Sequence, residues 1–178
     1  MHSRTPSSGP SDHEAEYQFS AELVSVITTA RRRAARDADQ QIDTAHLLHG
    51  LLEDDPEVVR LLDGGPQAGR LLGYLVQRSI GYGLRWQGTV EDSGALPVVC
   101  ADGVPGWSPA AVTALGRAVT RARERGAARA DGVDLFLALL RDGECRAVEV
   151  LRRVGIDVER LADRFHDRCE QGDTPVGA

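Results

Sequence analysis

One segment of this chain recurs 88 residues further on, and the recurrence limits what the chain can fold into. Residues 19–52, FSAELVSVITTARRRAARDADQQIDTAHLLHGLL, align without a gap on residues 107–140, WSPAAVTALGRAVTRARERGAARADGVDLFLALL. Nine of the 34 aligned positions are identical, and most other apolar positions are exchanged conservatively. Because one such unit leaves an apolar stripe uncovered, we expect the two copies to bury these stripes against each other about a pseudo-twofold axis.

Helical spacing of apolar residues predicts four helices in each copy. In residues 20–38 the apolar positions recur every three or four residues, while Arg32 and Arg36 fall on the opposite side. A second helix is expected to begin at Thr44, with Asp43 or Thr44 as its N-cap, and two more are expected over residues 57–62 and 67–79. The predicted fold class is all-α, with two four-helix repeats packed into one eight-helix domain.

Composition divides the chain into five segments. We expect a disordered tail over residues 1–17, a first repeat over 18–80, a linker over 81–106, a second repeat over 107–166 and a C-terminal tail over 167–178. The linker is rich in Gly, Pro and Ser, and its TVEDSGALPVV stretch could form a small hairpin with DSG as the turn.

The three cysteines and the hydropathy pattern point to the cytoplasm. Cys100, Cys145 and Cys169 are odd in number and lack C-x-x-C spacing, which suits free thiols in a reducing compartment. The chain has neither a run of about 18 apolar residues nor the apolar core of a signal peptide. We therefore expect a cytoplasmic protein with no membrane partner.

Several enzyme classes are disfavoured because the chain contains no lysine, so that all 21 of its Lys and Arg side chains are arginine. A Walker-A loop, a pyridoxal Schiff base and a kinase ATP site each need a lysine. Nucleophile-elbow, zincin and phosphate-loop motifs are also missing from the sequence. We expect no catalytic residues and no cofactor.

A net charge of −6 disfavours a general nucleic-acid partner, because such binders are normally basic. The RRRAAR run at residues 31–36 keeps open an alternative, a nucleic-acid-associated regulator that uses arginine-rich helices, although a charge run on one helix is usually a solvated face.

Two groups of residues suggest metal ligands without completing a site. Asp43, His46 and His49 follow one another at three-residue steps, but Asp43 lies in the helix cap and a fourth ligand would have to come from elsewhere. His166 and Cys169 stand close to the C-terminus. We predict no metal site.

The doubled segment resembles the Clp amino-terminal repeat. The resemblance lies in a leading aromatic followed by Ser, a helix with small residues at regular spacing, the stretch IDTAHLLHGLL and a following VVRLL helix, and it spans about residues 18–165. The second copy, ADGVDLFLALL, is weaker because it lacks the Thr and the His. In the first copy the resemblance implies that His46 packs and hydrogen-bonds at the start of its helix. No ATPase ring follows in this sequence, so it looks like a stand-alone Clp amino-terminal domain.

The resemblance implies a docking platform and not a catalyst. Such domains receive adaptors, unfolding substrates, cyclic-peptide antibiotics and, in some members, arginine-phosphorylated proteins. We therefore expect a non-enzymatic protein- or peptide-binding module whose partner is a Clp unfoldase, its adaptors or substrates, or a cyclic peptide. It would act either as a regulator of a Clp unfoldase–protease or as a decoy for cyclic-peptide toxins.

The resemblance also suggests which residues form the site. Members that bind phosphoarginine offer a hydroxyl after each leading aromatic, retained here as Ser20 and Ser108, and a glutamate in each copy, replaced here by Ala45 and Val133. Without a carboxylate to match the guanidinium fork, phosphoarginine binding is not expected. We expect the starts of the two repeats to approach one another and to form the ligand surface, around five residues: Tyr17, Phe19, Ser20, Trp107 and Ser108.

Overall fold

The computed structural model describes residues 18–62, 66–79, 91 and 106–171. Within this part of the chain the all-α prediction is confirmed, because eight helices are joined by loops and only two two-residue strands are present. The first repeat contains α2 (Ala21–Arg36), β1 (Gln41–Ile42), α3 (Thr44–Asp54), α4 (Pro56–Leu61) and α5 (Pro66–Ser79). The second contains β2 (Gly106–Trp107), α6 (Pro109–Glu124), α7 (Gly132–Leu140), α8 (Arg146–Arg153) and α9 (Val158–Gln171).

The C-terminal boundary of the second repeat differs from the expected one. Helix α9 continues to Gln171, so it extends into the segment that we expected to be a tail. The N-terminal tail lies outside the described residues, and so does the hairpin predicted in the linker, except for Glu91.

The helices of the two repeats begin in the same way. Ser20 and Ser108 are the N-caps of α2 and α6, and each side chain accepts a hydrogen bond from a backbone N–H in the first turn. Asp43 caps α3 and Asp131 caps α7, each in a reciprocal capping box. Asp43, and not Thr44, is therefore the cap of the second helix.

The first helices of the repeats also end in the same way. Ala38 has φ 55° and its repeat equivalent Gly126 has φ 74°, both in the left-handed region. Beyond each, an N–H reaches back to the helix, from Asp39 to the Ala34 carbonyl at 3.0 Å and from Ala127 to the Ala122 carbonyl at 2.8 Å. The second repeat uses glycine for this conformation, whereas the first holds an alanine there.

Short backbone pairings join the two repeats. Strand β1 pairs in parallel with β2, with Ile42 opposite Trp107. At the equivalent place in the other direction, Phe19 forms a parallel bridge with Ala130. The start of each repeat is thus bonded to the segment before the second helix of the other repeat, which is the arrangement expected of a pseudo-twofold pair.

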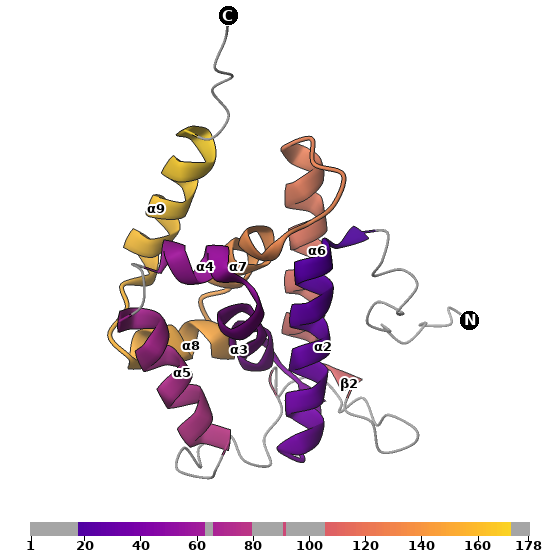
Figure 1. Ribbon diagram of the computed structural model, residues 1–178, viewed down its shortest axis with the longest axis vertical. Coiled ribbons are helices and arrows are strands. Elements are labelled where there is room, and N and C mark those ends of the chain that lie inside the picture. Colours follow the sequence, from indigo (N-terminus) through magenta and orange to yellow (C-terminus); the bar gives the residue numbers. More distant parts are fainter. Residues whose placement is uncertain (1–17, 63–65, 80–90, 92–105, 172–178) are drawn as a thin grey trace, which may run out of the picture.

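The second helices of the two repeats form the centre of the core. Every residue of α3 from Thr44 to Leu52 is buried, and so are nearly all residues of α7. Figure 1 shows α2 and α6 on one side of these central helices and α5 and α9 on the other. The buried apolar residues form one continuous cluster drawn from both repeats. Among the described residues, no helix is both long enough and apolar enough to cross a membrane.

Candidate binding site

Trp107 presents the more accessible of the two leading aromatic rings. Its side chain is partly buried against the core, and the guanidinium carbon of Arg31 lies 5.6 Å from the ring centroid. A cation at this distance is attracted by the ring face. Trp107 and Arg31 therefore form a small aromatic and cationic surface, and one residue comes from each repeat.

Phe19 occupies a different environment at the other end of α2. Its side chain is only 3% exposed and belongs to the core cluster. Arg31, which covers Trp107, lies ten residues beyond the start of α2 at Ala21, or about 15 Å along the helix axis. The structure thus does not bring Phe19 and Trp107 together, and a groove walled by both rings is not formed.

The remaining predicted site residues divide between the same two ends. The N–H of Ser20 donates to the Ala130 carbonyl at 2.8 Å, and the N–H of Ser108 donates to the Ile42 carbonyl at 2.9 Å. The Ser20 side chain is partly exposed, whereas Ser108 is fully buried. Tyr17 lies outside the described residues.

A buried carboxylate from the inter-repeat segment lies between the two repeats. Glu91 is 5% exposed, and each of its carboxylate oxygens accepts two hydrogen bonds. Oε1 accepts from the Thr44 hydroxyl at 2.5 Å and the Arg146 N–H at 2.8 Å. Oε2 accepts from the Thr44 N–H at 3.0 Å and the Ser108 hydroxyl at 2.7 Å. We call this arrangement the Glu91 socket.

Opposing effects act on the pKa of Glu91 in this socket. Burial and the negative charge of Asp43 raise the pKa of Glu91 above its ordinary value, while the hydrogen bonds from Thr44, Arg146 and Ser108 act in the opposite direction. Arg146 donates to Glu91 through its backbone N–H, whereas its guanidinium donates to Asp43 Oδ2 at 2.7 Å.

The cysteine beside the socket is an unreactive thiol. Cys145 is buried, and burial raises the pKa of its thiol to about 11. It is therefore protonated at neutral pH.

His46 acts at its helix start as predicted. Its Nδ1 accepts the Asp43 N–H at 3.1 Å, and its Nε2 lies 3.0 Å from Asp39 Oδ2. Asp37, Asp39 and His46 bring one possible ligand atom each within 4.8 Å of one another. Nε2 and Asp39 Oδ2 already contact each other directly, and Nδ1 is held by the backbone N–H and the carboxylate of Asp43. We assign no metal to this group.

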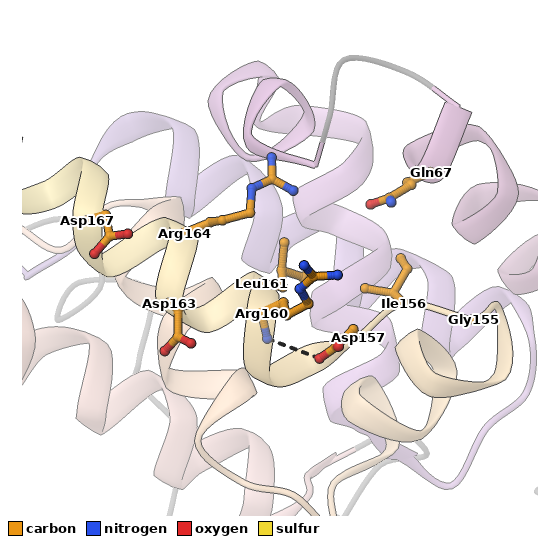
Figure 2. A pocket seen from close by; sticks show the side chains of 9 residues that line it. All are labelled: Gln67, Gly155, Ile156, Asp157, Arg160, Leu161, Asp163, Arg164 and Asp167. Carbon is orange, nitrogen blue, oxygen red and sulfur yellow. Dashed lines mark hydrogen bonds between the residues drawn. The ribbon is translucent and has the colours of Figure 1, made fainter.

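A hollow of about 520 Å³ lies between the start of α5 and the α8–α9 region. Figure 2 shows Arg160 and Arg164 on α9, Gln67 across from them on α5, and the Arg160 N–H donating to Asp157 Oδ1 at 3.0 Å. Asp163 and Asp167 also line it. Because two arginines meet three aspartates, the hollow does not select ligands of either charge.

The arginine-rich stretches are not combined into one basic surface. In the RRRAAR run, Arg31 covers Trp107 and Arg33 pairs with Glu53, while Arg32 and Arg36 are exposed. In the second repeat Arg125 pairs with Asp131 and Asp134. This distribution gives the nucleic-acid alternative no specific support.

Ala45 and Val133, which stand where the resemblance would place glutamates, offer no carboxylate. Ala45 is fully buried in α3, and Val133 is partly buried against the core. The Ser108 hydroxyl already donates to Glu91 and accepts from the Ala111 N–H at 3.0 Å.

Comparisons with known proteins identify the fold. The amino-terminal domain of the Clp protease-associated chaperone ClpD from Arabidopsis thaliana superposes with a TM-score of 0.63 and 19% identity, over 86% of this chain and 95% of that one. The Hsp104 amino-terminal domain from Candida albicans gives a TM-score of 0.64 and 14% identity, over 90% and 96%. A protein studied as part of a malarial protein secretion system gives 0.63 and 14%, over 89% and 99%.

These likenesses establish that the chain has the fold of a Clp amino-terminal domain over most of its length. The resemblance read from the two repeats is thereby confirmed at the level of the fold. No protein-family model matches the sequence, and no curated protein is similar to it.

Sequence reasoning missed two features of the site. Arg31 was treated as one member of a charged run, although its partner Trp107 lies in the other repeat. Glu91 was treated as one acidic residue of a linker, and its isolated position gives no periodic signal. The start of α8 has Cys145 at its N-cap without a side-chain capping bond, and only the structure shows this.

Proposed function

We propose that this protein is a non-catalytic module that binds proteins or peptides and works beside a Clp-type unfoldase in the cytoplasm. The observation that carries the proposal is the fold, which matches the ClpD and Hsp104 amino-terminal domains over 86% and 90% of this chain. The absence of lysine and of recognisable catalytic motifs from the sequence supports a binding role.

The proposed contact surface is the Trp107–Arg31 pair, because Ser108 is buried and Ser20 lies at the other end of α2. A partly exposed tryptophan beside an arginine offers a large rigid contact area with low loss of entropy on binding. Trp and Arg are also enriched among the residues that dominate binding energy. Phe19 then serves the fold from within the core and not the ligand.

Two mechanisms follow from this role. As a regulator, the module competes with the amino-terminal domain of the unfoldase for adaptors or substrates, or it bridges them to the unfoldase. As a decoy, it binds cyclic-peptide toxins and lowers their free concentration by mass action.

A direct binding experiment tests the role. The purified protein is titrated against a purified Clp unfoldase, its adaptors and a labelled cyclic peptide, and the partner that binds distinguishes regulator from decoy. Arg31→Gln should weaken binding at least fivefold, whereas Arg32→Gln, the adjacent but exposed arginine, should leave it unchanged.

Two results would contradict the proposal. If no member of the three partner classes binds, the role beside the unfoldase is wrong. If Arg31→Gln and Arg32→Gln have equal effects, the Trp107–Arg31 surface is not the contact.

A further inference from the structure

The Glu91 socket has the properties of a ligand site that happens to be filled from within the chain. Its donors come from both repeats, namely Thr44 at the start of α3, Ser108 at the start of α6 and Arg146 at the start of α8. The occupant comes from neither repeat, because Glu91 belongs to the segment between them. Thr44 and Ser108 are at least nine-tenths buried, so these donors are fixed by the core.

Helix α4 is the equivalent of α8 in the first repeat, and its capping carboxylate comes from the repeat itself. There Asp55 caps its own helix, α4, by accepting from the N–H groups of Glu57 at 2.9 Å and Val58 at 3.1 Å. Its carboxylate fills the space beside Gly132, where a Cβ would lie 1.7 Å from Asp55 Oδ2. This half is complete without any outside group.

Two differences leave the Glu91 half incomplete. Cys145 stands at the N-cap of α8 and makes no side-chain capping bond. Thr44, at the position equivalent to Gly132, adds a hydroxyl that also accepts the Ala147 N–H at 3.0 Å. The first-turn N–H of α8 and the Thr44 donors therefore need a carboxylate from outside both repeats.

The socket also contacts the backbone of its occupant. The Gln41 side-chain oxygen accepts the backbone N–H of Glu91 at 2.6 Å. Recognition of both the carboxylate and the adjacent backbone is suited to an acidic residue within a polypeptide, and less suited to a free small anion.

The donor set selects a carboxylate over other groups. Four donors divide equally between two oxygens, which satisfies a planar carboxylate. An amide offers one oxygen and would turn its own N–H groups toward these donors. A doubly charged phosphate would add charge next to the buried Asp43, which already opposes ionisation of Glu91.

We propose that the Glu91 socket is a recognition site for an acidic residue of a peptide segment, occupied within the chain by Glu91, and that an acidic segment of a partner protein binds there in its place. This inference concerns a surface separate from Trp107 and Arg31, and its test needs no unfoldase.

The test uses a labelled peptide with the sequence of residues 87–95, QGTVEDSGA, and measures its binding by fluorescence anisotropy. Replacing the internal occupant removes a competitor of high effective concentration, so Glu91→Ala and Glu91→Gln should bind the peptide about tenfold or more tightly than the unchanged protein. The same peptide with glutamine in place of its glutamate should bind at least tenfold more weakly than the original peptide.

Two controls separate this effect from a general change in charge or folding. Glu57→Gln removes an exposed glutamate from the first turn of α4 and should leave peptide affinity unchanged. Acetate, which matches the CH2–COO− group that the change to alanine removes, should raise the melting temperature of Glu91→Ala and have little effect on the unchanged protein. Glu91→Gln keeps the side-chain volume and decides the question if Glu91→Ala does not fold.

The proposal is overturned if the peptide binds the Glu91 variants no more tightly than the unchanged protein. It is also overturned if the glutamine peptide binds as well as the glutamate peptide. In either case Glu91 is a structural cap for α8 only.

Discussion

The N–H of Ser108 donates to the carbonyl of Ile42 at 2.9 Å, and through this bond the second repeat begins on the backbone of the first. The reverse bond joins Ser20 to Ala130 at 2.8 Å. Neither repeat can satisfy these groups alone, because the acceptor in each bond belongs to the other.

We therefore expect the two repeats to unfold together in one cooperative transition. The two repeats share backbone pairs and one continuous apolar cluster, so the loss of one uncovers the core of the other. Urea unfolding followed by far-ultraviolet circular dichroism and by tryptophan fluorescence should give coincident curves. Two separated transitions would show that the repeats are independent folds.

A chain that ends at Ser79 should not form a native fold. It would expose Phe19, Leu48 and Leu51, which are buried by the complete protein. Dye binding and broad amide resonances should report an aggregated or molten state. A sharp spectrum from this half would contradict the shared core.

Ala38→Gly should stabilise the protein by about 1 kcal/mol, because alanine at positive φ carries a steric cost that glycine avoids. The matched reverse change is Gly126→Ala at the equivalent turn, where a Cβ meets nothing within 4 Å and only φ 74° opposes it. That change should destabilise by about 1 kcal/mol. Thermal unfolding measures both, and equal signs for the two changes would contradict the explanation.

The fold could be predicted from sequence because its signals are local and doubled. The apolar spacing in residues 20–38 and the caps Ser20 and Asp43 lie within one helix or next to it, and the second copy repeats them. The all-α class and the helix positions followed from these signals, whereas the role of His46 at its helix start followed from the resemblance to the Clp repeat. The exchange of pairing between Phe19 and Ala130 did not, because it depends on how two apolar faces are oriented in space.

The site was harder to predict because its contacts join residues that are distant in the chain. Arg31 and Trp107 come from different repeats, and Glu91 contacts Thr44 and Arg146 from a segment without helical pattern. The missing side-chain cap of α8 and the distant carboxylate that replaces it are both visible only in the structure.

Gly132→Ala should destabilise the protein by about 2 kcal/mol. A Cβ at this position would lie 1.7 Å from Asp55 Oδ2, so the carboxylate must move away from the start of α4 and weaken its cap. Gly116→Ala in α6 is the control, because a Cβ there meets nothing within 4 Å and alanine favours the helix. Chemical unfolding should show opposite signs for the two changes, and a neutral Gly132→Ala would mean that Asp55 relocates without loss.

Free phosphoarginine should bind weakly or not at all. Ala45 and Val133 provide no carboxylate for its guanidinium, and the Ser108 hydroxyl is already bonded to Glu91. Titration calorimetry should detect no heat beyond dilution. Micromolar binding would show that another carboxylate replaces the missing pair.

Acidification should stabilise the unchanged protein relative to Glu91→Gln. Burial and the nearby charge of Asp43 raise the folded pKa of Glu91 above the ordinary 4.5, so the folded protein binds this proton more tightly than the unfolded chain does. Stability from this group therefore rises as the pH falls through the raised folded pKa toward 4.5, and it is lost again as the pH rises.

Glutamine does not titrate, while groups shared by both proteins, including Asp131 with its own raised pKa, cancel in the comparison. Urea unfolding at about pH 7 and about pH 5 should show the difference in unfolding free energy moving in favour of the unchanged protein at the lower pH. A difference that stays constant between the two pH values would mean that Glu91 does not titrate in this window, and that its four hydrogen bonds outweigh burial and the charge of Asp43.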